Sequence, residues 1–161
     1  MLIRNANASD FTQILQLNEE SVHFLSPLSL LRLQSLHAEA DYHRVLEIDN
    51  EIVGFLLAFR EGSQYDSTNY LWFLNQYEKF LYIDRVVIGK QHQGRGIGNK
   101  LYDDIFVYGR SSNAIRITCE FDIDPPNEAS RRFHQHYGFE EVGTRSYGNV
   151  SKQVSLQAVA L

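Results

Sequence analysis

Apolar residues recur at strand and helix spacings in the first quarter of the chain. A short apolar run at residues 2–4 predicts an edge-like strand. We expect Ser9 to cap a helix whose apolar stripe extends over residues 11–22. Pro27 interrupts this stripe, because proline cannot continue a helix. The leucine-rich pattern that follows predicts a second helix over about residues 29–40.

The next segments have the apolar and alternating character of strands. Residues 42–48 and 51–60 flank the dipeptide Asp49-Asn50, so we predict an antiparallel hairpin with a tight turn. Residues 61–79 follow as a long polar segment, and a loop of this length is usually either functional or partly structured. Its aromatic side chains either seal the edge of the core or cover a ligand cleft: Tyr65, Tyr70, Trp72, Phe73 and Tyr77.

Strand and helix patterns alternate in the second half of the chain. Residues 80–88 are apolar and rich in β-branched side chains, which predicts a strand. A glycine-rich turn follows, and the helical spacing of apolar positions over residues 97–108 predicts a helix that begins at this turn. Residues 115–121 alternate and predict a further strand.

The chain closes with a short helix and a hairpin. Residues 127–135 predict the helix, and Gly138 is a suitable C-cap for it. Residues 140–147 and 151–160 predict a hairpin across Gly148-Asn149. This order predicts a mixed α/β domain of the α+β class, with one twisted, mostly antiparallel sheet of six to seven strands and about four helices.

Length and composition limit the possible functions. A chain of 161 residues is long enough for one domain over residues 1–161 with a sizeable core. The 15 Lys and Arg residues against 20 Asp and Glu residues give a net charge of −5, which argues against binding to nucleic acid or to an anionic membrane. The single cysteine excludes an intrachain disulfide, and no signal peptide or spanning segment is recognisable, so we expect a cytoplasmic protein. The histidines have no metal-ligand spacing, and we expect no metal.

The glycine-rich turn reads Gln93-Gly-Arg-Gly-Ile-Gly98. Glycines let a ligand approach the backbone, and a helix N-terminus offers unpaired N–H groups to a pyrophosphate. A dinucleotide fingerprint would need glycine in place of Asn99, and a Walker loop would also need Ser or Thr in place of Leu101. The remaining pattern, Q-x-x-G-x-G, resembles the coenzyme A loop of the GNAT superfamily of N-acyltransferases. The alternative is a turn whose glycines serve packing alone.

A second signature lies between Asn127 and Phe139. It resembles the GNAT pattern N-x-x-A/S-x-x-F-Y-x-x-x-G-F, with Ser130 and Phe133 at matching positions. Two signatures in the expected order, separated by one helix and one strand, are more specific than either alone. The chain is therefore identified as a member of the GNAT superfamily, with the resemblance strongest from Phe80 onward.

The resemblance implies acetyl-CoA as donor, bound in a V-shaped opening where the parallel strands at 80–88 and 115–121 splay apart. The pantetheine arm would pair with the backbone of Val86, Val87 and Ile88. The pyrophosphate would contact the turn and the helix start: Gln93, Arg95, Gly96, Ile97, Gly98, Asn99 and Lys100. Asn127 matches the family's pantetheine-contacting asparagine, although it is also suited to be an N-cap.

Acyl transfer to an amine needs a base, because a free amine is mostly ammonium at neutral pH. The resemblance implies that this base lies on one of the splayed strands. Glu120 is the first candidate and Asp84 the second, and a period of two would place Asp84 on the same face as Val86 and Ile88. The alternative for each carboxylate is a salt bridge or a place at the edge of the sheet without a catalytic role.

The general acid is where the chain departs from the family pattern. The tyrosine that usually protonates the departing thiolate aligns with His134. Imidazole titrates near neutrality and can donate a proton. Tyr137, one turn later, is the alternative donor.

We therefore expect an N-acetyltransferase that transfers acetyl from acetyl-CoA to a primary amine by direct attack in a ternary complex. One alternative is a catalytically inactive acyl-CoA-binding sensor or interaction domain, and another is a nucleotide-binding protein with a generic phosphate loop. The acceptor is a small molecule or a peptide, and we expect residues 61–79, including Tyr70 and Trp72, to shape its site together with the link between the first two helices. The terminal hairpin offers an edge that could pair across a homodimer.

Overall fold

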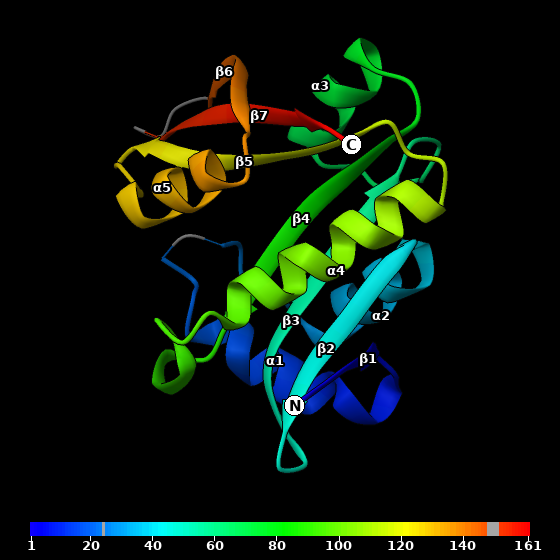
Figure 1. The fold of residues 1–161 in the computed structure, drawn as a ribbon, viewed down its shortest axis with the longest axis vertical. Coiled ribbons are helices and arrows are strands. Elements are labelled where there is room, and N and C mark those ends of the chain that lie inside the picture. The colour runs from blue at the N-terminus through cyan, green and yellow to red at the C-terminus, as the bar shows by residue number, and fades with distance from the viewer. Residues whose placement is uncertain (24, 148–151) are drawn as a thin grey trace.

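A seven-stranded mixed sheet forms the centre of the molecule (Figure 1). The computed structural model describes residues 1–23, 25–147 and 152–161. Across the sheet the order is β1-β2-β3-β4-β5-β7-β6, and among these neighbours only β4 and β5 are parallel. The strands are β1 (Leu2–Asn5), β2 (Tyr42–Ile48), β3 (Glu51–Arg60), β4 (Phe80–Ile88), β5 (Arg116–Asp124), β6 (Glu140–Ser146) and β7 (Gln153–Ala160).

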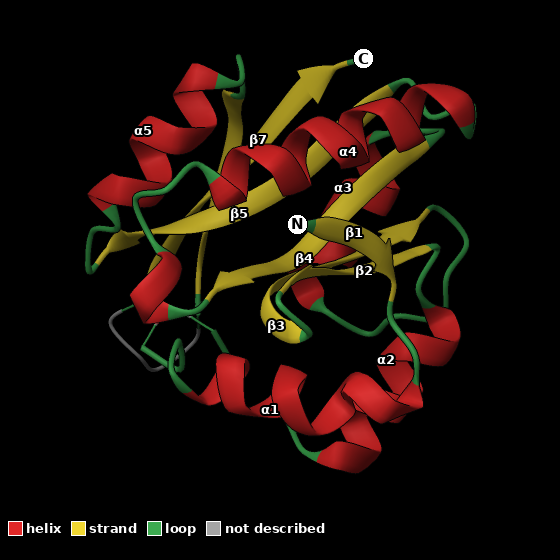
Figure 2. Ribbon diagram, turned by 60° about the horizontal axis from the view of Figure 1, so that its bottom comes forward, coloured by secondary structure: helices red, strands yellow, loops and turns green. Residues whose placement is uncertain are grey.

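Helices cover both faces of the sheet (Figure 2). They are α1 (Phe11–Glu19), α2 (Leu30–Glu39), α3 (Thr68–Gln76), α4 (Ile97–Ser111) and α5 (Glu128–His136), with short 3-10 turns at Ala8–Asp10 and Lys90–His92. α1 and α2 lie on one face, and α4 and α5 on the other. This arrangement confirms the predicted class, with five helices in the described residues instead of about four. None of them is long and apolar enough to cross a membrane.

The apolar patterns account for the packing of these layers. In α4, Ile97, Leu101 and Ile105 recur at helical spacing and are buried against the sheet, whereas Val107 is 65% exposed. β3 is buried from Ile52 to Phe59, because it lies inside the sheet with helices on both sides.

Residues 61–79 are partly structured, one of the two expectations for this segment, because α3 forms within them. Tyr70 and Phe73 lie three positions apart and are fully buried against Phe80 and Tyr82. The packing of these large rings stabilises a helix whose remaining residues are mostly polar. The prediction that the aromatics seal the core is confirmed for Tyr70 and Phe73.

The prediction of Ser9 as a helix cap is also wrong. Asn7 caps the 3-10 turn that leads into α1, since its side-chain oxygen accepts a hydrogen bond from the Ser9 N–H at 2.9 Å. The Asp10 carboxylate completes a capping box by accepting the Asn7 N–H at 2.8 Å. The cap therefore lies two residues earlier than predicted.

The strands of both predicted hairpins pair as expected. Asp49 and Asn50 join β2 and β3 with φ angles of 52° and 65°, the left-handed conformations of a tight hairpin turn. β6 and β7 pair in antiparallel fashion, and β6 is an outer strand of the sheet. The predicted turn at Gly148-Asn149 lies outside the described residues.

Candidate active site

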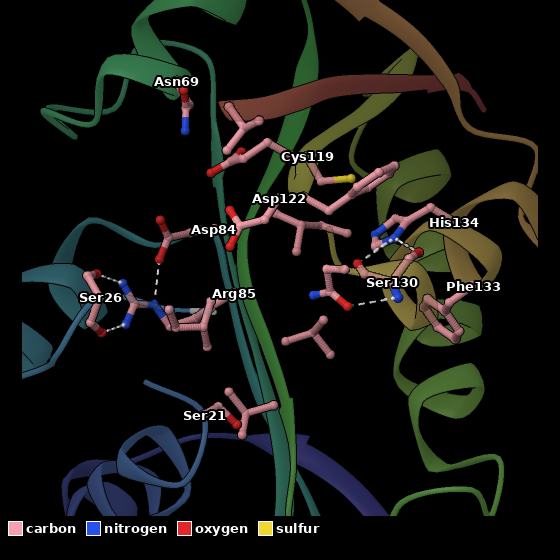
Figure 3. A pocket seen from close by; sticks show the side chains of 18 of the residues that line it. Ser21, Ser26, Asn69, Asp84, Arg85, Cys119, Asp122, Ser130, Phe133 and His134 are labelled. Atoms are coloured by element: carbon pink, nitrogen blue, oxygen red, sulfur yellow. Dashed lines mark hydrogen bonds and ion pairs between the residues drawn. The ribbon is translucent and has the colours of Figure 1, made fainter. Parts of the chain in front are cut away.

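The parallel strands β4 and β5 pair only at their beginnings. Three residue pairs connect them, and the last is Tyr82 with Thr118. Beyond that pair the facing edges have no strand partner within the described part of the chain. A cavity of about 830 Å³ opens where the strands diverge, and the starts of α3, α4 and α5 also line it. Figure 3 shows Asp84 and Arg85 on one side of this cavity and Ser130, Phe133 and His134 on the other.

A β-bulge at Asp84 marks the beginning of the divergence. Leu57 of β3 pairs with Arg85 and the next residue, Ala58, pairs with Ile83, so Asp84 is an extra residue without a partner on β3. The prediction that Asp84 shares a face with Val86 and Ile88 is therefore wrong. Val86 and Ile88 pack with α4, whereas Asp84 contacts Arg85 and Tyr65 on the opposite face.

The last residues of β4 lie along the cavity. Val86, Val87 and Ile88 pair with β3 on one edge and line the cavity on the other. Their second edge faces no strand among the described residues. Buried backbone groups without a partner are costly, so this edge is suited to an amide-bearing ligand that binds as an additional strand.

Two glycines give the turn after β4 its shape. Gly94 and Gly96 both have φ of +75°, and a Cβ added at either would meet no heavy atom within 4 Å. The Gln93 side chain donates to the Ile88 carbonyl at 3.0 Å and holds the turn against the end of the strand. The turn is thus open on the side where a ligand would approach.

Gly96 is also the N-cap of α4. The first N–H groups of a helix have no intrahelical partner, so those from Gly96 to Asn99 are directed to this opening. The Lys100 N–H donates to the Gly96 carbonyl at 3.2 Å and is therefore used within the helix. Arg95 is exposed beside it. Gly98 lines the cavity, and an added Cβ would lie 3.6 Å from the Phe133 ring.

Asn127 lines the cavity at the start of α5. Its side-chain oxygen accepts the Ser130 N–H at 3.2 Å, which makes it the N-cap of the helix. The amide nitrogen of the same side chain remains as a donor for a ligand. The capping role and the predicted contact with pantetheine are therefore compatible.

Glu120 lies half-buried on β5 and lines the cavity. The Tyr82 hydroxyl donates to its Oε1 at 2.8 Å, and its Oε2 is buried without a hydrogen-bond partner in the described residues. Burial raises the pKa of Glu120 to about 8, the charge of Asp84 adds to the rise, and the Tyr82 hydroxyl opposes it. A carboxylate with such a pKa is suited to accept and return protons near neutral pH.

Asp84 has both carboxylate oxygens engaged. The Tyr65 hydroxyl donates to Oδ1, and Arg85 Nε donates to Oδ2 at 2.6 Å. Both side chains of this ion pair are about 95% buried, with exposures of 6% for Asp84 and 5% for Arg85. Arg85 also donates to the Asn18 side chain at 3.0 Å, so the pair anchors the end of α1 beside the cavity. These contacts match the salt-bridge alternative for Asp84 more closely than a free base.

His134 is buried in α5 with both ring nitrogens in hydrogen bonds. Nδ1 lies 2.7 Å from the Ser130 carbonyl, which accepts only, so this nitrogen carries the proton. Nε2 lies 2.7 Å from the Tyr102 hydroxyl oxygen and accepts a hydrogen bond from that hydroxyl. Burial lowers the pKa of His134, so the ring is neutral and its N–H is directed at the backbone. Tyr137 lies outside the cavity and donates to Asp103 at 2.9 Å.

A profile of the acetyltransferase (GNAT) family matches residues 8–139 of the chain. The chain belongs to the GNAT acetyltransferase family. The match includes the glycine turn, Glu120 and all of α5, so the GNAT assignment made from two short signatures is confirmed over most of the chain.

The chain is also similar to individual known proteins. The uncharacterized N-acetyltransferase YesJ of Bacillus subtilis (strain 168) is 24% identical over 126 residues, which cover 74% of this chain and 67% of YesJ. The crystal structure of Ard1 from Thermoplasma volcanium has a TM-score of 0.81 at 17% identity, covering 99% of this chain and 97% of Ard1. The structure of Arabidopsis thaliana Naa50 in complex with the bisubstrate analogue CoA-Ac-MVNAL has a TM-score of 0.76 at 16% identity, covering 99% of this chain and 98% of Naa50. At these identities the two structures establish a common fold.

A third solved structure with this fold was determined with its cofactor. The yncA protein from Salmonella typhimurium, in complex with acetyl-CoA, has a TM-score of 0.75 at 16% identity and covers 99% of this chain and 93% of its own. In the present chain, no group of three or more His, Cys, Asp or Glu side chains among the described residues could hold a metal ion.

Sequence reasoning missed two residues of this GNAT cavity. Asn69 in α3 is 2% exposed, and its side-chain nitrogen donates to the Tyr147 hydroxyl oxygen at 2.5 Å. Both residues line the cavity, whereas Tyr70 is fully buried in the core and Trp72 packs against Gly143, so neither shapes the cavity wall. A helical reading of residues 61–79 would have placed Asn69 beside the buried Tyr70 and Phe73 and so revealed a buried amide.

Proposed function

We propose that the protein transfers an acetyl group from acetyl-CoA to a primary amine by direct attack within a ternary complex. The observation that carries this proposal is the cavity between β4 and β5, which joins an open phosphate-binding turn to Glu120. GNAT membership and the acetyl-CoA bound to yncA support acetyl-CoA as the donor.

The cofactor would lie along the free edge of β4. The amides of pantetheine pair with the backbone of Val86, Val87 and Ile88, and the Asn127 amide nitrogen donates to the same arm. The pyrophosphate binds the N–H groups from Gly96 to Asn99, close to the positive charges of Arg95 and Lys100. Gln93 holds the turn in place through its bond to the end of β4.

Glu120 acts as the base in this reaction. Its ionised carboxylate takes one proton from the acceptor ammonium, and the neutral amine then attacks the thioester carbonyl. The new C–N bond forms, the C–S bond breaks with its electron pair leaving on the sulfur, and the nitrogen of the product releases its second proton to solvent. Asp84 supports Glu120 by keeping its pKa high, since the two negative charges repel.

The departing thiolate needs a proton. His134 would have to break its bond with the Ser130 carbonyl to supply one, and burial disfavours its charged form. Protonated Glu120 is the better source, because its pKa of about 8 is close to the pKa of about 8.5 of an ordinary thiol. We therefore assign the shuttled proton to Glu120 and a structural role to the His134–Tyr102 pair.

The acceptor binds on the side of the cavity formed by α3 and the segment between α1 and α2, where Ser26 and Asn69 lie. The peptide portion of the analogue bound to Naa50 makes a peptide N-terminus one candidate and small amines another. The net charge of −5 favours cationic amines over nucleic acid or an anionic membrane, and a cytoplasmic location remains our expectation. The outer edge of β6 is where we expect a homodimer to form.

The alternative of an inactive acyl-CoA-binding domain is not favoured. Family membership supports catalysis, and Glu120 has an unpartnered oxygen and a pKa near neutrality, which a binding domain would not need.

The direct test of the proposal follows acetyl transfer by mass spectrometry. Purified protein is incubated with acetyl-CoA and a panel of primary amines, and we expect at least one amine to gain an acetyl group while coenzyme A is released. Titration calorimetry checks the donor separately, with NAD as the control nucleotide. Binding of acetyl-CoA without transfer to any amine would support the inactive domain, and binding of NAD that coenzyme A does not displace would support a generic phosphate loop.

A further inference from the structure

Asn69 is held rigidly at the acceptor side of the cavity. The helix that carries it, α3, is fixed to β6, because Arg145 donates to the Thr68 carbonyl at 2.8 Å and Gly143 leaves room for the Trp72 ring. A Cβ on Gly143 would lie 2.8 Å from that ring. Asn69 itself is 2% exposed and donates to Tyr147. These contacts fix the position of a buried amide beside the cavity.

The direction of the hydrogen bond decides what Tyr147 can do. Figure 3 shows the Asn69 nitrogen turned toward the cavity. The neighbouring Glu120 favours this orientation, since a carboxylate attracts the N–H side of an amide, and Asn69 lowers the pKa of Glu120 accordingly. The Tyr147 oxygen therefore accepts from Asn69 and keeps a second lone pair for an occupant of the cavity.

Glu120 supplies a second acceptor on the same wall. Its Oε2 is buried and has no partner among the described residues. A buried carboxylate oxygen without a hydrogen bond is costly, so the occupant of this site should bring N–H donors. An ammonium group carries three donors and a positive charge.

We propose that Glu120 Oε2 and the Tyr147 oxygen bind the ammonium group of the acceptor, and that Asn69 is the positioning residue that acts on both of these acceptor groups. This assignment rests on the proposed acetyl transfer and names the amine subsite within it. The ammonium gives one proton to Glu120, and a remaining N–H stays bonded to Tyr147 while the nitrogen lone pair attacks the thioester. Asn69 thus orients the amine without touching it.

Several other titratable groups interact electrostatically with Glu120. The charged ones are Asp84, paired with Arg85, and Asp122, which lies 3.5 Å from Lys152. The titratable neutral ones come from the loop before α3, from β4, from α4, from β5 and from the end of β6: Tyr65, Tyr82, Tyr102, Cys119 and Tyr147. Because Asn69 is neutral, its removal changes none of these charges.

The test compares Asn69→Ala and Tyr147→Phe with Leu71→Ala, a control on the same helix whose side chain is 42% exposed. The donor is acetyl-CoA, and the acceptors are a polyamine, an arylethylamine and an alanine-initiated peptide. We expect Asn69→Ala and Tyr147→Phe each to raise the KM of the best acceptor roughly 10-fold. The KM of acetyl-CoA should stay within about twofold of the wild-type value. Asn69→Ala should also move the acidic limb of the kcat/KM profile to higher pH, because the nearby Asn69 amide lowers the pKa of Glu120 and the variant lacks it. Leu71→Ala should match the wild type.

A readout that needs no acceptor completes the test. The Glu120 carboxyl carbon is titrated by NMR in protein labelled with 13C-glutamate, and we expect a higher midpoint in Asn69→Ala than in wild type. Unchanged acceptor KM, or an unchanged Glu120 midpoint, would overturn the role of Asn69. Absence of transfer in the wild type would contradict the proposed function, and the NMR midpoint would still decide whether Asn69 acts on Glu120.

Discussion

A substitution at Gly96 provides the sharpest test of the proposed coenzyme A binding site, because the chain contains a matched control glycine. Gly96 has φ of +75° and Gly62 has φ of +83°, and a Cβ added at either would meet no heavy atom within 4 Å. Only Gly96 lies at the start of α4, in the turn that we assign to the pyrophosphate. Alanine at these two positions should therefore have the same backbone cost and different effects on cofactor binding.

The cost to stability follows from the backbone. A non-glycine residue in the left-handed region costs roughly 1–2 kcal/mol, which corresponds to a fall in Tm of about 2–8 °C for a domain of this size. We expect this loss for both Gly96→Ala and Gly62→Ala. For the cofactor, the new methyl group of Gly96→Ala occupies the open space beside the turn, and we expect affinity for coenzyme A to fall by at least roughly 10-fold, or about 1.4 kcal/mol.

The assay is titration calorimetry with coenzyme A on both variants, with thermal unfolding measured on the same samples. The expected result is a similar fall in Tm and a loss of affinity in Gly96→Ala alone. Dissociation constants within about twofold of each other for the two variants would refute the assignment of this turn to the pyrophosphate. A large difference in Tm would refute the equal backbone cost.

Three further perturbations test other parts of the account. Burial lowers the pKa of His43 to about 4. As the pH falls below about 6.5, the unfolded chain therefore binds a proton at His43 before the folded chain does, and the free energy of unfolding should drop by up to about 3 kcal/mol between pH 6.5 and 4. Urea denaturation that gave wild type and His43→Leu the same pH dependence would contradict this. Gly143→Ala should displace the Trp72 ring, shift its fluorescence to longer wavelength and cost about 1–3 kcal/mol of stability, whereas unchanged emission would show that the ring is not confined there. Tyr82→Phe removes a hydrogen bond that lowers the pKa of Glu120, so the acidic limb of the rate profile should move to higher pH, and a shift to lower pH would count against this bond.

Local signals explain why much of the fold could be predicted from the sequence. The turn from Gln93 to Gly98 and the N-cap at Asn127 depend on residues adjacent in the chain, and both formed as expected. The hairpin turn at Asp49 and Asn50 has the same local origin. In each case the side chains that define the conformation are contiguous, so periodicity and turn chemistry suffice.

The parts that could not be predicted depend on contacts between distant residues. The bulge at Asp84 arises from the register between β3 and β4, which no local pattern encodes, and it reverses the face on which Asp84 lies. α3 depends on burial of Tyr70 and Phe73 against another strand. His134 resembles a free general acid in the sequence, and only the fold brings Tyr102 to its Nε2.

The pH dependence of acetyl-CoA-dependent thiol release in wild type and Glu120→Gln tests the central claim most directly. With a saturating amine, the wild-type rate should rise with pH to a midpoint near 8, because Glu120 must be ionised to accept a proton. Glu120→Gln should be slower by roughly 100-fold or more at pH 8, lack this limb and bind acetyl-CoA as tightly as the wild type. A variant that keeps both the wild-type rate and the limb near pH 8 would contradict the assignment of Glu120 as the base.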